Sequence, residues 1–275
     1  MQTLTGKLDR YLSLLPLWSL LLIYLLILSL IALFAYKRKW LTLSGSVSAV
    51  VLGLIVLWMG GVSAFVIFLF FFVSSSLVSK LSKFVNRREK KGNRRDMVQV
   101  LANGLPAVLS IMMVRIPALS IAALAAFSAS NAEATADTWS GAFGVMSHKN
   151  PVSIITFTKV PRGISGGVTA LGFLGGFSAS LLIALLSMGV FGHGVGIACI
   201  IAGSGFLGSV IDSLLGAVVQ VQYRAKDGSL TEKEEENGEK NERVRGIPGF
   251  DNDVVNFTSG LLAASLAMIL TSLVS

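Results

Sequence analysis

Five carboxylates lie inside or beside long apolar segments, where a charge is costly and tends to mark a functional site. They are Glu133, Asp137, Asp212, Asp251 and Asp253. Glu133 and Asp137 are four residues apart, so on a helix they project from one face. Two like charges so close need a cation or a proton to be tolerated, and a divalent metal meets that need. Taken singly, each acid is explained equally well by helix packing or capping.

A glycine-rich basic segment, KVPRGISGG, occupies residues 159–167 and precedes another long apolar run. Its basic residues supply positive charge, and its small residues let backbone amides approach an anion at a helix N-terminus. The segment lacks the Walker pattern GxxxxGK[ST], so alone it is also consistent with a glycine-rich helix start. As phosphate-binding residues within it we predict Arg162, Gly163, Ser165, Gly166 and Gly167.

Carboxylates of this kind are ligands suited to Mg²⁺, which usually takes one or two of them together with substrate phosphates. We therefore predict a Mg²⁺ site at Asp137 and Asp212, with help from Asp253 and Glu133. Asp137, Asp212 and Lys159 are the predicted catalytic residues. The alternative is that 136–167 is a packed loop between two helices.

Composition places these residues in a membrane. Of the 275 residues 53% are hydrophobic and 14% charged, against about 25% charged in an average soluble domain. Cys199 is the single cysteine, which excludes a disulfide framework or a thiolate metal site. The net charge of +8 would suggest nucleic acid in a soluble protein. Here the basic residues cluster in loops, so we expect no nucleic-acid partner.

Apolar runs long enough to cross a bilayer predict an all-α bundle of eight transmembrane helices in one domain, 1–275, with seven as the alternative count. The second and third are separated only by Gly60-Gly61, which predicts a tight turn. The predicted spans are 16–36, 43–59, 62–79, 98–114, 117–134, 164–188, 195–221 and 254–274.

Most of the 23 Lys and Arg residues fall in alternate loops, which the positive-inside rule assigns to the cytoplasm. Both termini are then outside, and the cytoplasmic segments are a basic loop 80–97, a motif loop 134–167 and a charged hairpin 223–250. The basic loop serves mainly topology and attraction to anionic lipids, but its end offers Arg95 and, beyond it, Asn103 as substrate contacts. The tip 231–242 is expected to be mobile and inert. Asn252 and Asn256, which follow the hairpin, are further predicted substrate contacts.

At these residues the chain resembles the transmembrane protein 19 family, which includes the plant phytyl-phosphate kinases. The motifs that carry the resemblance are QVLANG at 99–104, ADTW at 136–139, VPRGISGG at 160–167, DSLLGAVVQ at 212–220 and NDVVN at 252–256. The resemblance implies phosphorylation of an isoprenyl monophosphate to the diphosphate by a nucleoside triphosphate. It also implies a prokaryotic plasma-membrane protein whose partners are that nucleotide, the isoprenyl-phosphate lipid and membrane lipids. A distant similarity to polyprenol kinases and phosphatidate cytidylyltransferases favours CTP.

One position departs from the family pattern. The family usually continues the ADTW motif to a glutamate where this chain has Ala142. If that glutamate binds metal or nucleotide, its loss affects activity, and Glu133 is the candidate substitute from the preceding turn.

Two other functions remain open from the sequence. A cytidylyltransferase acting on a lipid phosphate would use the same metal and substrates but release pyrophosphate. A lipid or small-molecule transporter would explain broken helices and acids within the membrane. A homodimer is also left open.

Overall fold

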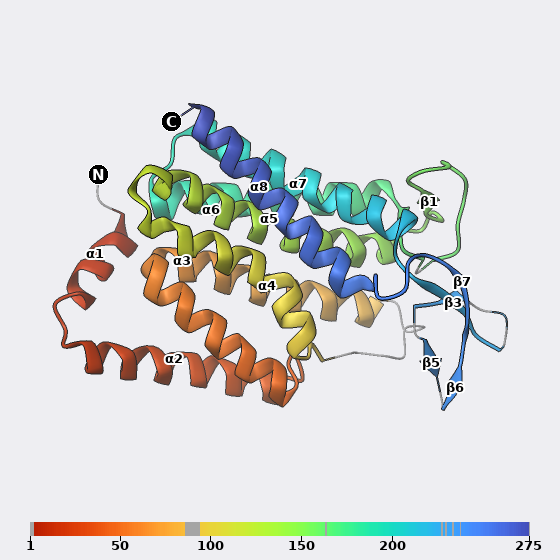
Figure 1. The fold of residues 1–275 in the computed structure, drawn as a ribbon, viewed down its shortest axis with the longest axis horizontal. Helices are drawn as coiled ribbons and strands as arrows, with labels where there is room; N and C mark the ends of the chain where they lie inside the picture. The colour runs from red at the N-terminus through yellow and green to blue at the C-terminus, as the bar shows by residue number, and fades with distance from the viewer. Residues whose placement is uncertain are drawn as a thin grey trace.

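The centre of the protein is one helix, α5 (Ser120–Met146), in a computed structural model that describes residues 3–274 except 86–93, 163, 227, 229, 233 and 237. Five helices pack around α5, and Figure 1 shows them as an elongated bundle. They are α3 (Leu43–Val85), α4 (Met97–Met112), α6 (Ala170–Phe191), α7 (Val195–Val218) and α8 (Asn252–Val274).

The remaining elements lie at the edge and at one end of the bundle. Helix α2 (Leu17–Lys37) packs on α3 at the periphery, and α1 (Leu4–Leu12) precedes it. Two short 3₁₀ turns, Met113–Arg115 and Pro117–Leu119, connect α4 to α5. The strands are β1 (Val152–Ser153), β2 (Gly167–Val168), β3 (Gln222–Arg224), β4 (Leu230–Thr231), β5 (Glu235–Glu236), β6 (Glu239–Lys240) and β7 (Glu242–Arg245).

Helix α5 is buried on all sides because its residues are small. From Ala122 to Ala136 nearly every side chain is buried, and most are alanine or serine. Small residues let helices approach closely in lipid, where apolar burial alone does not drive helix association. The neighbouring helices follow the same rule, because a Cβ added at Gly205 of α7 would lie 2.5 Å from the Ala132 Cβ. Close packing around α5 therefore accounts for glycines in the surrounding spans.

Helix α3 contains the turn predicted at Gly60-Gly61. Gly61 has φ of 67°, a conformation that favours glycine, and it divides α3 into two helical segments. The backbone N–H of Val62, at the start of the second segment, donates to Asp9 Oδ1 at 2.7 Å. Asp9 belongs to α1, so a side chain from another helix caps the second half of α3.

The bundle confirms the predicted fold class, a polytopic helical membrane protein. Among the described residues six helices are long and apolar enough to cross a membrane, and α3, with its break at Gly61, counts as one of them. Helix α5 is not in the set, although at 27 residues it is roughly 40 Å long. Its alanine, serine and charged residues lower its hydropathy, which is permissible because other helices cover it.

Two predicted boundaries need correction. The predicted loop 134–167 begins later, because α5 continues through Asp137 to Met146. The sixth span begins at Ala170 and not at 164. The tip 231–242 carries short strands, and Ser165 donates a hydrogen bond to Glu232 within it. Much of the basic loop 80–97, residues 86–93, lies outside the described residues.

Both termini lie at the end of the bundle opposite the strands (Figure 1). The loop between α5 and α6 and the segment between α7 and α8 lie together at the strand end. The polar motifs are therefore collected at one end of the molecule, and the termini at the other.

The cap from Asp9 generates a stability prediction. We expect Asp9→Ala to lower the stability of the protein by about 1 kcal/mol, the usual cost of losing a cap. Thermal unfolding of the detergent-solubilised protein measures the effect. Asp9→Asn, which keeps an acceptor oxygen, is the matched control and should retain most of the stability. Equal loss in the two variants would show that the negative charge, and not the cap, is what matters.

Candidate functional site

A cavity of about 320 Å³ lies at the strand end of the bundle. Its walls come from the second half of α5, the loop 162–169, the start of α6 and the end of α7, and Asn252 at the start of α8 closes it. The predicted acids and the predicted phosphate loop thus meet in one hollow. The cavity-lining residues from the predicted site are Asp137, Arg162, Ser165, Gly166, Gly167, Asp212 and Asn252.

Asp137 and Asp212 face this cavity from two helices and interact with each other through their carboxyl groups. Asp212 Oδ2 also lies 3.1 Å from Ser259 Oγ, within hydrogen-bonding distance. With the Asn256 amide oriented so that its nitrogen faces the acceptors, it donates to Asp212 Oδ2 at 3.0 Å. Asn256 is therefore a support for Asp212 from α8 and does not line the cavity.

Glu133 lies one turn deeper, buried inside the bundle and outside the cavity lining. Ser259 Oγ donates to Glu133 Oε1 at 2.8 Å and also lies 3.1 Å from Asp212 Oδ2. A hydroxyl has one hydrogen, so the second contact needs a proton on a carboxyl group or a cation. Gly208 makes room for this side chain, because a Cβ there would lie 2.6 Å from the Glu133 Cγ. Glu133 is thus connected to Asp212 through one serine.

The glycine loop forms another wall of the cavity and packs against the end of α7. Gly166 has φ of 81°, and a Cβ there would lie 2.3 Å from the Ala217 Cβ, so only glycine fits. The Gly167 N–H donates to the Ile164 carbonyl at 3.0 Å and is not available to an anion. Arg162 lines the cavity, and one guanidinium N–H donates to the His148 carbonyl at 3.2 Å. Gly163, also predicted here, lies outside the described residues.

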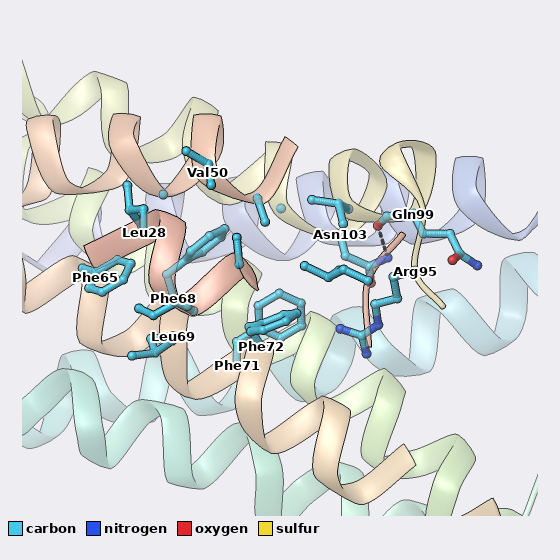
Figure 2. Close-up of a pocket in the computed structure, with 17 residues that line it drawn as sticks. Leu28, Val50, Phe65, Phe68, Leu69, Phe71, Phe72, Arg95, Gln99 and Asn103 are labelled. Carbon is cyan, nitrogen blue, oxygen red and sulfur yellow. Dashed lines mark hydrogen bonds between the residues drawn. The ribbon is translucent and has the colours of Figure 1, made fainter. Parts of the chain in front are cut away.

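Other predicted residues lie elsewhere. Lys159 is exposed, pairs through its backbone with Val152 and does not line the cavity, which weakens its predicted catalytic role. Asp253 also lies outside the cavity lining. The charges that act on it are the like charges of Asp251 and Asp96, and not those of Asp137 and Asp212. Arg95 and Asn103 line a second, separate hollow (Figure 2).

Arg95, which lines the second hollow, interacts electrostatically with Asp137, which lines the cavity. Burial lowers the pKa of its guanidinium to about 10, and the nearby Asp137 acts in the opposite direction. Arg95 therefore stays protonated at neutral pH and places a positive charge beside the acid that lines the cavity.

The position of the missing family glutamate is buried. Ala142 is 7% exposed and lies outside the cavity lining, although its α5 neighbours Gly141 and Gly144 belong to that lining. Thr138 and Val145, one turn before and one turn after Ala142 on the same face of α5, do line the cavity, so position 142 lies at its edge.

Arg245 is a structural support for the site that the sequence did not identify. Its Nη1 donates to the Ala217 carbonyl at 2.8 Å, and its Nη2 to the Ser165 carbonyl at 3.2 Å. It thus fastens the glycine loop to the last turn of α7. In the sequence, the glycine that follows Arg245 was the available signal. Gly246 has a positive φ and lies so close to the Gln220 carbonyl that a Cβ would not fit, which keeps this segment near the end of α7.

The donor set fits a metal only in part. No group of three or more His, Cys, Asp or Glu side chains in the described part of the chain is arranged to hold a metal ion. The pair Asp137 and Asp212 matches the way Mg²⁺ binds with substrate phosphates, which needs only one or two carboxylates. The pair fits Mg²⁺ that enters with a phosphate ligand, and not a permanently bound ion.

Comparison with known proteins agrees with this architecture. Residues 26–264 match the model of the integral membrane protein DUF92 family. The chain belongs to this family. That result confirms the family resemblance stated from the motifs.

Curated relatives cover most of the chain. Protein PGR of Arabidopsis thaliana is 31% identical, over 88% of this chain and 92% of its own. An uncharacterised membrane protein of Methanocaldococcus jannaschii is 32% identical, over 73% of this chain and 83% of its own. An uncharacterised membrane protein of Synechocystis is 28% identical, over 84% and 83% respectively. No solved structure matches the chain.

The contacts of Arg245 generate a prediction about the loop. Arg245→Ala should increase hydrogen exchange in residues 164–167 and lower the stability by about 1–3 kcal/mol, because hydrogen bonds from a charged group are lost. Arg243→Ala, on the exposed part of the same strand, is the matched control and should change neither. Unchanged exchange in the loop of Arg245→Ala would contradict the fastening role.

Proposed function

We propose that this protein is a membrane-embedded kinase that converts an isoprenyl monophosphate to the diphosphate with a nucleoside triphosphate. The observation that carries the proposal is the shared cavity, which Asp137 and Asp212 line together with Arg162 and the glycine loop. Paired acids together with a cation and a glycine-rich loop suit phosphates held with a metal, and phosphoryl transfer is mainly positioning and charge neutralisation.

In the proposed reaction a phosphate oxygen of the lipid attacks the γ-phosphorus of the nucleotide. The bond from that phosphorus to the bridging oxygen of the nucleotide breaks. The nucleoside diphosphate leaves, and the lipid becomes the isoprenyl diphosphate. Mg²⁺ would neutralise charge on the phosphates, held by Asp137 and Asp212. Ser259 and Asn256 keep Asp212 in place. Arg162 offsets negative charge at the loop side of the cavity.

The setting of the reaction is part of the proposal. The site faces the cytoplasm of a prokaryotic cell, because the basic loops lie on the motif side of the membrane. The family resemblance favours CTP among the nucleotides. A transporter has less support, because the cavity lies at one end of the bundle and the polar motifs gather there with it.

Product analysis tests the reaction class. Purified protein is incubated with Mg²⁺, each of the four nucleoside triphosphates and geranylgeranyl or phytyl monophosphate, and products are identified by mass spectrometry. We expect an isoprenyl diphosphate and a nucleoside diphosphate. A nucleotidyl-lipid with pyrophosphate would instead identify a cytidylyltransferase. Folded protein that turns over no donor would contradict both enzymatic proposals.

Substitution of the acids tests the assignment of roles. Asp137→Asn and Asp212→Asn should each lower kcat about a hundredfold or more, because metal-assisted charge stabilisation contributes several kcal/mol. Asp253→Asn, which lies outside the cavity, is the isosteric control and should retain near-parental turnover. Glu133→Gln probes the deeper acid: unchanged metal-dependent turnover would exclude Glu133 from metal binding.

A further inference from the structure

A narrow slot lies between the peripheral helix α2, both halves of α3, and α4 (Figure 2). Its free volume is about 60 Å³, and it is not fully enclosed. The walls are almost entirely apolar, with aliphatic side chains from α2 and the first half of α3 facing aromatic rings from the second half. Labelled examples are Leu28, Val50, Phe65, Phe68 and Phe72.

The slot lies at the periphery of the bundle, where it is in contact with lipid. Helix α2 has buried side chains at only Tyr24, Leu28, Ala32 and Ala35, so most of its surface faces the surroundings. It packs against α3 and forms the outer wall of the slot. Along the second half of α3 the lining extends from Phe65 to Phe72, which is roughly 10 Å of helix. Because a cavity of about 150 Å³ is needed to hold one benzene ring, the slot admits only a short segment of a single hydrocarbon chain, and not a ring or a bulky headgroup.

One end of the slot is polar. Arg95, Gln99 and Asn103 gather there, while Leu28, Val50 and Phe65 lie toward the other end (Figure 2). The Asn103 amide donates to the Gln99 carbonyl at 2.9 Å, which orients it. The slot therefore has the character of an amphiphile site, with an apolar body and a cationic end.

The backbone fixes Arg95 in this place. Its N–H donates to the Trp40 carbonyl at 2.9 Å, and its carbonyl accepts from the Thr42 N–H at 3.0 Å. A Cβ on Gly45 would lie 2.3 Å from that carbonyl oxygen, so glycine is what permits the close approach. The guanidinium carbon lies 5.9 Å from the centroid of the Phe71 ring. The positive charge thus lies against an aromatic wall of the slot and interacts electrostatically with Asp137 of the cavity.

We propose that this slot binds the phosphate-proximal segment of the isoprenoid chain of a prenyl monophosphate, with the rest of the chain in the bilayer, and that Arg95 binds its phosphate. The proposal rests on the proposed kinase function, for which it names the lipid site. A charged end suits an anionic head, and a narrow bore suits one chain, so a two-chain phospholipid would leave one chain outside. The methyl branches of an isoprenoid pack against the aromatic rings of α3. The phosphate at Arg95 then lies next to Asp137, where the nucleotide is held.

Filling the slot tests where the chain binds. Ala49 lines the slot and Val51, two residues on, faces outward with 52% exposure. Ala49→Phe should raise KM for geranylgeranyl monophosphate about tenfold or more, because several methylene groups lose their apolar site. KM for the nucleotide should not change. Val51→Phe adds a ring to the same helix outside the slot and should leave both constants unchanged. Equal KM values for the lipid in the two variants would overturn the slot assignment.

Removing the positive charge of Arg95 tests where the phosphate of the lipid binds. Arg95→Gln should lose the preference for prenyl monophosphate over prenyl alcohol in a competition binding assay, with affinity for the monophosphate falling about tenfold or more as a charge-assisted contact is lost. Arg95→Lys should restore part of that preference. If Arg95→Gln still prefers the monophosphate as strongly as the parent does, the phosphate binds elsewhere.

Photo-crosslinking separates the lipid site from the reaction. A diazirine-bearing prenyl monophosphate is activated on the parent protein in nanodiscs without nucleotide, and modified residues are mapped by mass spectrometry. Labelling at the α2, α3 and α4 lining, competed by geranylgeranyl monophosphate and not by phosphatidic acid, supports the slot even if no turnover is found. Labelling elsewhere, or equal competition by phosphatidic acid, overturns it even if the kinase activity is present.

Discussion

The rest of the structure depends on keeping acidic groups of α5 inside a bundle of apolar helices. A carboxylate in such surroundings needs partners, and each one here receives them from another part of the chain. Glu133 is met by Ser259 of α8, and Asp137 by Asp212 of α7 and by Arg95. Gly208 on α7 leaves the space that the Glu133 side chain fills. The small residues of the bundle thus allow other helices to pack closely around α5, and its polar contacts provide partners for the acids that α5 carries.

That solution explains why the polar motifs share one end of the molecule. The acids occupy the second half of α5, so the helices that partner them must present polar groups at the same level. Asp212 lies near the end of α7, and Asn252 and Asn256 lie at the start of α8, which runs back from the strand end. The glycine loop then reaches the cavity because Arg245 fastens it to the last turn of α7. Motifs more than a hundred residues apart in sequence become neighbours through helix length and direction alone.

Some of this arrangement was accessible from sequence and some was not. Span positions followed from apolar runs of bilayer length, and the break in α3 from Gly60-Gly61, because both are local signals. The continuation of α5 to Met146 was missed since its alanines and polar residues weaken the hydropathy signal. Residue types suggested Lys159 as readily as Arg162, but the direction of a loop side chain is decided by tertiary contacts. The contact between Arg245 and Ser165 spans 80 residues, and no local pattern records it.

The geometry of α5 also bears on the glutamate that this chain lacks. A helix turns by about 100° per residue, so Glu133, Asp137, Gly141 and Gly144 fall on one face, and the last three line the cavity. Ala142 is rotated by about 140° from Asp137 and is buried, on the side of α5 that carries Thr138 and Val145, which also line the cavity. An acid at 142 would therefore lie at the edge of the cavity, on a different side of α5 from Asp137. Glu133 lies one turn before Asp137 on the face of α5 that lines the cavity, deeper in the bundle. Its contact with Asp212 through Ser259 makes it the residue of this helix best placed to influence the cavity from inside the bundle.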